Sequence, residues 1–423
     1  MESYMIAVLQ HIHRAQRVTR RALCEQTGLS LGRVNALVSQ LLRRGLLREA
    51  GVQEGVPGRP AALLSLNSDA GRVVGLDIGG HQSRAVLSDL SGRILTTLVR
   101  PTEAVPDPTV ILDNLARLVE AVCQRAGIQA ATLSALGVGV RAIVNTQTGV
   151  VQGWPSAPAW SPGWTGLDVP ASLGHRLGVS PVVLDDAVRA MAMTAHRFGP
   201  ARSYRNFLYV FLGTAIGAGV FVDGRPYLGS QGIAGELGHI SISEDGPWCS
   251  CGNRGCLEVM ASTSAVMRRV RERLTESQLM SALREPYARD ELTLAALIEA
   301  ACAGDKLAFQ ILDETGSYVG KVIALALNLL GPELVVLGGP LAQDGGIILA
   351  AVQRQVRLFA LQHISRHLTI VCDDQGELAG ARGAALLAIE RLLSSPEHLA
   401  RLLSMVQAVG QAPRSTADRR RRG

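Results

Sequence analysis

The sequence is poor in several features, and each shortage excludes a class of protein. Seven cysteines in 423 residues are too few and too scattered for the disulfide framework of a small secreted protein. No apolar run approaches the ~20 residues that cross a bilayer, and the N-terminus does not resemble a signal peptide. Only Lys306 and Lys321 are lysines, so nearly all positive charge is arginine. We therefore expect a cytoplasmic protein without membrane contact.

Charge is distributed unevenly along the chain. Residues 1–66 carry nine arginines and four glutamates, and residues 401–423 carry six arginines and one aspartate. Because the net charge of the whole chain is only +6, the central part is mildly acidic. A basic N-terminal part, here called the head, on an acidic body predicts a polyanion-binding module joined to a domain with another task.

Four metal-ligand residues fall within 18 residues: His239, Cys249, Cys251 and Cys256. Three thiols and an imidazole complete a tetrahedral shell for zinc and leave no position open for catalysis. Free buried thiols or a disulfide are the alternatives, but a Cys-x-Cys pair rarely places its Cβ atoms correctly for an unstrained disulfide. We predict one structural Zn²⁺ ion per chain.

The head has the pattern of a winged helix-turn-helix. A first helix is expected over residues 3–15, a second between the cap Thr19 and Gly28, and a third after the cap Ser30. Two strands, starting at residues 46 and 61, would form the wing, with an arginine in the turn between them. A small helical module for protein–protein contact is the alternative.

The third helix is the expected recognition helix. Its apolar residues recur with the 3.6-residue period, which leaves small and hydrogen-bonding residues facing away from the core. Such residues beside arginines suit insertion into the major groove, and a single arginine on a stiff turn suits the minor groove. The predicted DNA contacts are Ser30, Gly32, Arg33, Asn35, Ala36 and Ser39 in the helix and Arg59 in the wing.

Glycine turns follow three apolar strands of the body. Two strand–glycine-turn–strand units lie about 135 residues apart and predict two similar lobes that offer backbone N–H groups to a ligand in the cleft between them. A third glycine turn follows the strand at residues 333–336. The residues of interest in these turns are Asp77, Gly79, Gly80, Gly213, Thr214, Gly338 and Gly339.

Together these motifs resemble the ROK family, which contains transcriptional repressors and sugar kinases. The most specific part is the run at residues 234–239 followed by the three cysteines and Glu258. The resemblance covers about residues 1–390 and implies membership of the repressor branch. It implies a mainly α winged helix-turn-helix followed by an α/β actin-like (ribonuclease H-like) two-lobed sugar-kinase fold.

The resemblance also assigns the residues of a sugar site. It implies that His239 both binds zinc and faces the sugar, and that Glu236 and Glu258 bond sugar hydroxyls. Asp186 takes the position of the kinase base, and we expect it and its neighbour Asp185 to contact the sugar.

The phosphate side of the pattern has changed more than the sugar side. His81 and Gln82 stand where the family has threonine and lysine, Ala215 replaces a glycine, and Arg141 with Ala142 replaces a Pro-Gly pair. Phosphoryl transfer depends on positioning and charge stabilisation. We therefore expect vestigial phosphate loops, no catalytic residues and no kinase activity.

The combined prediction is a sugar-responsive DNA-binding regulator, a repressor of genes for carbohydrate uptake and use. One alternative is an active sugar kinase, which ATP consumption with a hexose or N-acetylhexosamine would reveal. Another is a regulator controlled by a partner such as a sugar-transport protein, with a relic pocket. Glucose, xylose, N-acetylglucosamine and phosphorylated sugars all stay open as the inducer.

We expect four parts in the chain. These are a winged helix-turn-helix over residues 1–67, a first lobe over 70–190, a second lobe with the zinc loop over 191–390, whose last helix returns to the first lobe, and a helical extension with a disordered basic tail over 391–423. Because one helix-turn-helix reads few base pairs, a homodimer or homotetramer should bind the operator. The resemblance places the protein in the bacterial cytoplasm, at the nucleoid when bound to DNA.

Overall fold

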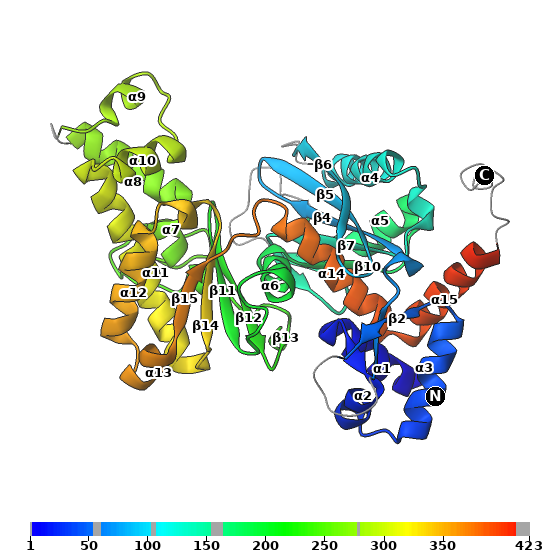
Figure 1. Cartoon of the computed structure of the whole chain (residues 1–423). Helices are drawn as coiled ribbons and strands as arrows, with labels where there is room; N and C mark the ends of the chain where they lie inside the picture. Colours follow the sequence, from blue (N-terminus) through cyan, green and yellow to red (C-terminus); the bar gives the residue numbers. More distant parts are fainter. Residues whose placement is uncertain (1, 54–60, 103–106, 154–163, 277–279, 412–423) are drawn as a thin grey trace, which may run out of the picture.

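A computed structural model of the chain describes residues 2–53, 61–102, 107–153, 164–276 and 280–411 (Figure 1). A small head lies below one end of a larger body, and the body consists of two lobes (Figure 1). Within the described ranges, no helix is long and apolar enough to cross a membrane. The expected fold class is confirmed.

The head is a three-helix module with a three-stranded sheet of order β1-β3-β2. Its caps are the predicted ones. The Thr19 hydroxyl accepts a hydrogen bond from the Ala22 amide, and the Ser30 hydroxyl accepts one from the Arg33 amide. Gly28 ends the second helix with φ of 69°, a left-handed conformation that glycine adopts without strain. The elements are α1 (Glu2–Ala15), β1 (Val18–Thr19), α2 (Arg20–Thr27), α3 (Leu31–Arg43), β2 (Leu47–Val52) and β3 (Ala62–Leu66).

The first lobe contains a five-stranded sheet of order β10-β7-β4-β5-β6. Strands β4, β7 and β10 are parallel, so their carboxyl ends meet at one edge, while β5 and β6 are antiparallel additions. Helices α4 and α5 cover one face. The elements are β4 (Arg72–Ile78), β5 (Gln82–Asp89), β6 (Ile94–Pro101), α4 (Pro108–Arg125), η2 (Ala130–Thr132), β7 (Ala135–Val140), β8 (Ile143–Asn145), β9 (Val150–Gly153), α5 (Val169–Leu177) and β10 (Val182–Asp186).

The second lobe repeats this plan with a sheet of order β13-β12-β11-β14-β15 and a larger set of helices. Apolar side chains from one face of this sheet form a core with those helices. The elements are β11 (Phe207–Leu212), β12 (Ile216–Val222), β13 (Arg225–Pro226), η3 (Leu237–His239), α7 (Leu257–Ala261), α8 (Thr263–Glu276), α9 (Arg284–Ala288), α10 (Leu294–Cys302), α11 (Lys306–Leu330), β14 (Leu334–Gly338), η4 (Pro340–Gln343), α12 (Ile347–Phe359), α13 (Gln362–His367) and β15 (Thr369–Cys372).

Two helices, α6 (Ala187–Phe198) and α14 (Ala379–Ser394), lie between the sheets of the two lobes (Figure 1). They pack closely because glycine stands at their crossing: a Cβ on Gly383 would overlap the carbonyl group of Ala190. Helix α14 packs against β4 and β7 of the first lobe, and α6 packs against β11 and β12 of the second. These two helices therefore join the lobes.

The head is attached to this central layer by a continuous apolar core. Buried residues of α1, such as Leu9 and Ile12, belong to the same cluster as Leu392 of α14 and Leu402 of α15 (Pro396–Gln411). Burying a large aliphatic side chain contributes roughly 1.5–3 kcal/mol, so this contact strongly favours one fixed placement of α1.

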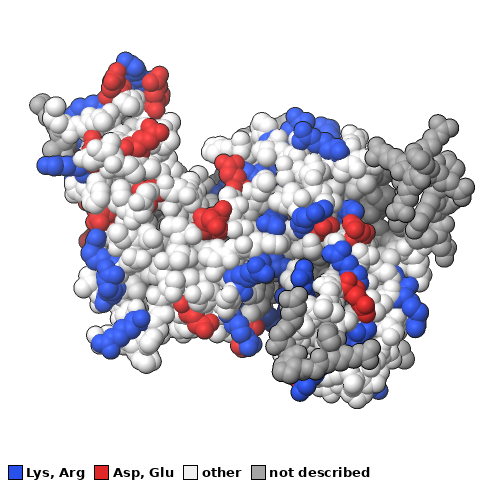
Figure 2. Space-filling view, in the orientation of Figure 1, with Lys and Arg blue, Asp and Glu red and all other residues white. Residues whose placement is uncertain are grey.

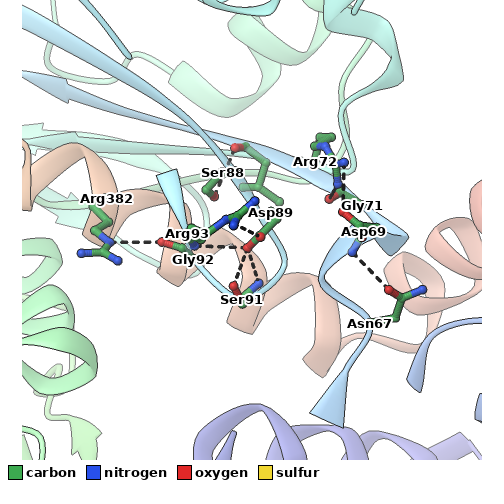
Figure 3. A network of polar contacts seen from close by, with 11 residues as sticks. Asn67, Asp69, Gly71, Arg72, Ser88, Asp89, Ser91, Gly92, Arg93 and Arg382 are labelled. Carbon is green, nitrogen blue, oxygen red and sulfur yellow. Dashed lines mark hydrogen bonds and ion pairs between the residues drawn. The ribbon is translucent and has the colours of Figure 1, made fainter. Parts of the chain in front are cut away.

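The short connection between head and first lobe is also ordered by polar contacts. The Asn67 side chain donates to the carbonyl of Gly45 in the head at 2.7 Å and accepts from the Asp69 amide at 3.2 Å. Asp69 in turn pairs with Arg72 at the start of β4. Nearby, Arg382 of α14 donates to the carbonyl of Gly92 in the β5–β6 turn (Figure 3). The Asn67 contacts thus order the connection between head and first lobe, and the Arg382 bond ties α14 to the first lobe.

Candidate functional site

A cavity of about 250 Å³ lies between the two lobes. Its walls come from the β4–β5 turn and the ends of β7 and β10 on one side, and from the β11–β12 turn, η3 and α7 on the other. Four of the five residues predicted to bind a sugar line it: Asp186, Glu236, His239 and Glu258.

Asp186 has two structural roles. It is the last residue of β10 and the N-cap of α6, where its Oδ1 atom accepts hydrogen bonds from the amides of Val188 and Arg189, both at 2.9 Å. The same side chain lines the cavity. Burial raises its pKa, against the opposing effect of Arg189. The capping bonds fix the carboxylate at the edge of the cleft.

Two glutamates face the cleft from the second lobe. Glu258 is buried, and its Oε2 atom accepts a hydrogen bond from the Ile216 amide at 3.0 Å. Partial burial, followed by the charges of Asp186 and Glu258, raises the pKa of Glu236 to about 7. The Nε2 atom of His239 lies 3.9 Å from the Glu236 carboxylate. The cavity therefore concentrates hydrogen-bond acceptors.

Arg141 is a cleft residue that the list of predicted ligands did not contain. Its guanidinium donates to the Thr214 hydroxyl at 2.6 Å, which connects the two lobes. Its Nη2 atom also lies 3.0 Å from the place where a Cβ on Gly80 would stand. The guanidinium thus lies between the first and second glycine turns. The replacement of Pro-Gly at the end of a parallel strand was the signal for this placement, because such strand ends form ligand sites.

Asp77 is the second-last residue of β4 and interacts electrostatically with Arg141. Burial raises its pKa to about 6, although Arg141 and Arg84 act in the opposite direction. Of the predicted phosphate-loop residues, Gly80 and Thr214 line the cavity. The others lie outside its lining: Asp77, Gly79, Gly213, Gly338 and Gly339.

Asp185, expected to contact the sugar, does not lie with the other four residues. It is buried and forms an ion pair with Arg189 at 2.6 Å. Successive residues of a strand point to opposite faces, so Asp185 and Asp186 cannot both face the cleft. Asp185 instead supports the start of α6 by holding Arg189, which also donates to the carbonyl of Gly232.

The predicted zinc ligands are brought together. One ligand atom from each of His239, Cys249, Cys251 and Cys256 lies within 4.8 Å of all the others. The Cys249 sulfur lies 3.6 Å from His239 Nδ1, and the Cys251 and Cys256 sulfurs are also 3.6 Å apart. A tetrahedral Zn²⁺ with Zn–S bonds of ~2.3 Å separates its ligands by about 3.8 Å. All seven cysteines are free, so this cluster could hold a metal ion.

The loop that carries the cysteines is built for a close turn. Gly255 has φ of 58°, and a Cβ there would overlap the carbonyl group of Ser243. An isolated β-bridge pairs Ser241 with Cys256. Cys256 is also the N-cap of α7, the helix that carries Glu258. The metal-ligand cluster and the cleft glutamates are therefore parts of one local structure.

The recognition helix α3 presents the expected surface. Four of its apolar residues are buried, and its N-terminal residues are exposed. The guanidinium of Arg33 lies 4.9 Å from the ring centre of Tyr4, which orders this side chain beside the exposed face. Arg59 lies outside the described residues. Of the predicted contacts, Gly32, Arg33, Asn35 and Ala36 are exposed, and Ser39 is half-buried.

A winged helix-turn-helix head on a two-lobed body with a polar cleft defines a class: DNA-binding proteins built on a sugar-kinase fold. Comparison with family models agrees. The model described as the ROK family matches residues 73–391, and the model described as winged helix-turn-helix DNA-binding matches residues 1–48. The chain belongs to the ROK family.

Two relatives show the branch of the family. The chain is 27% identical to the DNA-binding transcriptional dual regulator NagC of Escherichia coli (strain K12) over 368 residues, which cover 86% of this chain and 87% of NagC. It is 26% identical to the xylose repressor of Bacillus subtilis (strain 168) over 388 residues, which cover 91% and 94% of the two chains.

Solved structures match both branches of the fold. A ROK family transcriptional regulator, homologous to the Mlc protein of E. coli, superposes with a TM-score of 0.81 at 26% identity, over 95% of this chain and 99% of the other. A ROK family glucokinase from Streptomyces griseus superposes with a TM-score of 0.65 at 27% identity, over 75% and 99%. The match to the regulator covers more of this chain than the match to the glucokinase, and the additional part includes the head.

Proposed function

We propose that the chain is a sugar-responsive transcriptional repressor that controls genes for carbohydrate uptake and use. The similarity to NagC and to a xylose repressor supports a repressor of this kind. The observation that carries the proposal is that the two sides of the cleft differ: the sugar side keeps its predicted residues, and the phosphate side does not. Acceptors for sugar hydroxyls line the cavity, while an arginine occupies the space between the glycine turns.

The sugar side uses carboxylates as acceptors. A sugar presents several hydroxyl donors, and bonds to charged acceptors contribute about 1.5–3 kcal/mol each. Asp186 would bind from the first lobe and Glu236, His239 and Glu258 from the second, so the sugar would bridge the cleft. Asp185 would act only through Arg189.

The nucleotide side argues against kinase activity. The ROK resemblance places phosphates between the glycine turns, and here the Arg141 guanidinium lies there, hydrogen-bonded to Thr214. Ala215 adds a Cβ beside the second turn. We infer that the cleft binds a sugar without phosphorylating it. ATP consumption above background with a hexose or N-acetylhexosamine would refute this inference.

One zinc ion would be held by His239, Cys249, Cys251 and Cys256. A four-ligand zinc supplies structural stabilisation, because the shell leaves no site for substrate. Fixing His239 through Nδ1 would leave its Nε2 atom on the cleft side, near Glu236. The metal would thereby order the acceptor side of the cleft.

DNA binding would use α3 in the major groove and the wing in the minor groove. The contacts would come from Ser30, Gly32, Arg33, Asn35, Ala36 and Ser39, together with Arg59 of the wing. A dimer would place two such helices on a two-fold operator.

A second copy of the chain is the proposed partner of an apolar surface on the second lobe. The C-terminal ends of α11 and α12 lie together, because Asn328 bonds the backbone of Phe359 and Leu361. An exposed apolar group of this kind marks an interface more often than a free surface. Leu329→Arg should convert the dimer to a monomer in sedimentation experiments, and an unchanged mass would place the interface elsewhere. The group consists of Leu325, Leu329, Leu330, Leu358, Phe359 and Leu361.

Operator affinity with and without sugars tests the proposed function directly. Free and phosphorylated hexoses, pentoses and N-acetylhexosamines are first screened by thermal shift, since a ligand of the folded state raises its stability. The stabilising sugar should then weaken operator binding. If no sugar stabilises the protein while a sugar-transport protein releases it from DNA, control by a protein partner replaces control by a sugar.

A further inference from the structure

A second cavity, here called the junction groove, lies where the head meets both lobes. It has a volume of about 380 Å³. Helix α1 of the head supplies Gln10, His13 and Arg14, and α14 supplies Glu390 and Arg391. The remaining walls come from β10 and the turn after β8 in the first lobe, and from β13 and the residues after it in the second lobe. Figure 1 shows α1, β13 and the end of α14 converging at this point.

Positive charge exceeds negative charge around the junction groove. Arg14 and Arg391 line it, and Arg225 and Arg197 act electrostatically on Glu390 from adjacent positions. Asp185, on the wall from β10, is already paired with Arg189. The other lining carboxylate, Glu390, interacts electrostatically with three guanidinium groups, those of Arg14, Arg197 and Arg225. In Figure 2, Lys and Arg side chains border the crease between head and lobes on the face shown.

Apart from this longer-range interaction with Glu390, the guanidinium groups have no carboxylate in direct contact among the described residues. Arg14, Arg225 and Arg391 form no ion pair in the described part of the chain. Arg197 donates to the carbonyl of His13 at 2.6 Å, but its Nε and Nη2 atoms are buried without an acceptor. A buried donor without an acceptor is destabilising. Arg197 lies outside the lining of the groove, so it adds positive charge near the groove and not a direct contact.

A buried polar atom adds independent evidence. His13 is only 4% exposed, it lines the junction groove, and its Nδ1 atom has no hydrogen-bond partner among the residues that the structure describes. Buried polar atoms in folded proteins are almost always bonded. Burial and the nearby arginines lower the pKa of His13. A neutral imidazole can donate one hydrogen bond to a ligand oxygen.

We propose that the junction groove binds a small phosphate-bearing molecule, separate from the sugar cleft. Guanidinium groups match phosphate oxygens in geometry and charge, and Arg14 of α1 and Arg391 of α14 both line the groove. His13 and Gln10 supply neutral polar contacts at the head side. The volume lies within the range of about 300–1,000 Å³ typical of small-molecule sites.

A DNA backbone is the other polyanion that could meet these arginines, but the geometry disfavours it. A duplex cannot enter a cavity of this size, and the floor residue His13 is almost fully buried. The recognition helix contacts the opposite end of α1, through Arg33 and Tyr4. Nine residues separate Tyr4 from His13, which is about 14 Å along a helix.

The position of the junction groove implies that a bound ligand would affect how the lobes are placed relative to the head. Its walls belong to the head, the first lobe and the second lobe, so a bound phosphate would join β13 to α1. Any movement of the second lobe that closes the cleft would change the distance between β13 and α1. The bound anion should therefore stabilise one placement of the lobes relative to the head.

Inorganic phosphate is the direct probe, used with the full-length protein at constant ionic strength. Isothermal titration should show saturable binding, and hydrogen exchange should fall in peptides covering residues 10–16 and 225–228. The double variant Arg14→Gln/Arg391→Gln should weaken phosphate binding at least tenfold. The control Arg271→Gln removes the same kind of charge from an exposed position on α8 and should leave binding unchanged.

The outcomes separate this proposal from its rivals. Equal phosphate affinity in the wild type and the double variant, or no saturable binding, overturns it. If phosphate does not bind but the double variant lowers the salt dependence of DNA affinity, the arginines contact DNA. Glycerol 3-phosphate binding more tightly than inorganic phosphate would indicate an organic phosphate. None of these results depends on whether the cleft binds a sugar.

Discussion

The sugar cleft and the junction groove are opposite in charge. The cleft contains the carboxylates of Asp186, Glu236 and Glu258, and burial raises the pKa of the first two. At the junction, burial lowers the pKa of Arg197 to about 10 and also lowers that of Arg14. Each site therefore holds an excess of one kind of group. The cleft suits a ligand with many donors, and the groove suits an anion.

The two sites also differ in what surrounds them. The lobes meet at the cleft through polar side chains, including the hydrogen bond from Arg141 to Thr214. The head meets the body through a continuous apolar core and an ordered connection. A polar interface opens at lower cost than an apolar core. The cleft should therefore open and close more easily than the head separates from the central layer, and a bound sugar would act on DNA binding by changing the relative position of the two lobes.

Loss of the metal should give the largest difference between the two sites. Cys256→Ser should lose close to one equivalent of zinc and the entire sugar response, because the loop that carries this ligand also starts the helix of Glu258. Phosphate binding at the junction should persist. Elemental analysis and titration measure both, with Cys302→Ser, outside the cluster, as the control. Wild-type protein purified without zinc would contradict the prediction.

The cleft should also reveal itself through the pH dependence of stability. The pKa of Asp77 is about 6 in the fold against an ordinary value of 3.8. Between these values the folded protein keeps a proton that the unfolded chain has released, so the contribution of Asp77 to stability is greatest below pH 4 and falls as the pH rises through 6. The loss amounts to about 3 kcal/mol.

Asp77→Asn removes this dependence. Relative to the wild type, the variant should gain up to about 3 kcal/mol between pH 4 and pH 7, measured by urea unfolding. Glu291→Gln, an exposed change of the same charge, should show no such gain. Parallel stability curves for Asp77→Asn and the wild type would mean that Arg141 fully compensates the buried carboxylate.

Features set by neighbouring residues were predictable from the sequence. Thr19 and Ser30 are the N-caps at which α2 and α3 begin, and Gly28 is the residue at which α2 ends. All three act through contacts within three or four residues, so their pattern is local. The metal ligands were predictable for a related reason: unusual ligand residues are concentrated in one short loop. The family resemblance then supplied the fold that separates the two lobes.

Features set by distant contacts were not predictable in this way. Arg14 and Glu390 lie 376 positions apart, and no pattern in the sequence places them in one cavity. Arg141 was visible as a departure from the family pattern, but its bond to Thr214 depends on how the lobes close. The separation of Asp185 from Asp186 follows from strand alternation, which the expectation of a shared sugar contact overlooked.

Asp186→Asn tests the cleft with little risk to the fold. Asparagine is as good an N-cap as aspartate, so α6 should persist and operator affinity without sugar should be unchanged. Loss of the charged acceptor should weaken the sugar response about 30-fold, from about 2 kcal/mol of hydrogen-bond energy. Asp305→Asn makes the same change at the N-cap of α11, away from the cleft. An unchanged response in Asp186→Asn would leave Asp186 as a cap alone.

The smallest expected effect tests the junction groove from its acidic side. Glu390 lines the groove among the arginines, and burial raises its pKa against the opposing effects of Arg14, Arg197 and Arg225. Glu390→Gln removes the remaining repulsion toward an anion and should tighten phosphate binding about threefold, or about 0.7 kcal/mol. The gain should grow as the pH rises, because the wild-type carboxyl loses its proton. Titrations at pH 6 and pH 8 measure both effects. Weaker binding in Glu390→Gln at both pH values would mean that the carboxyl holds the arginines in place for the ligand, and the excess of positive charge would then not be what attracts the anion.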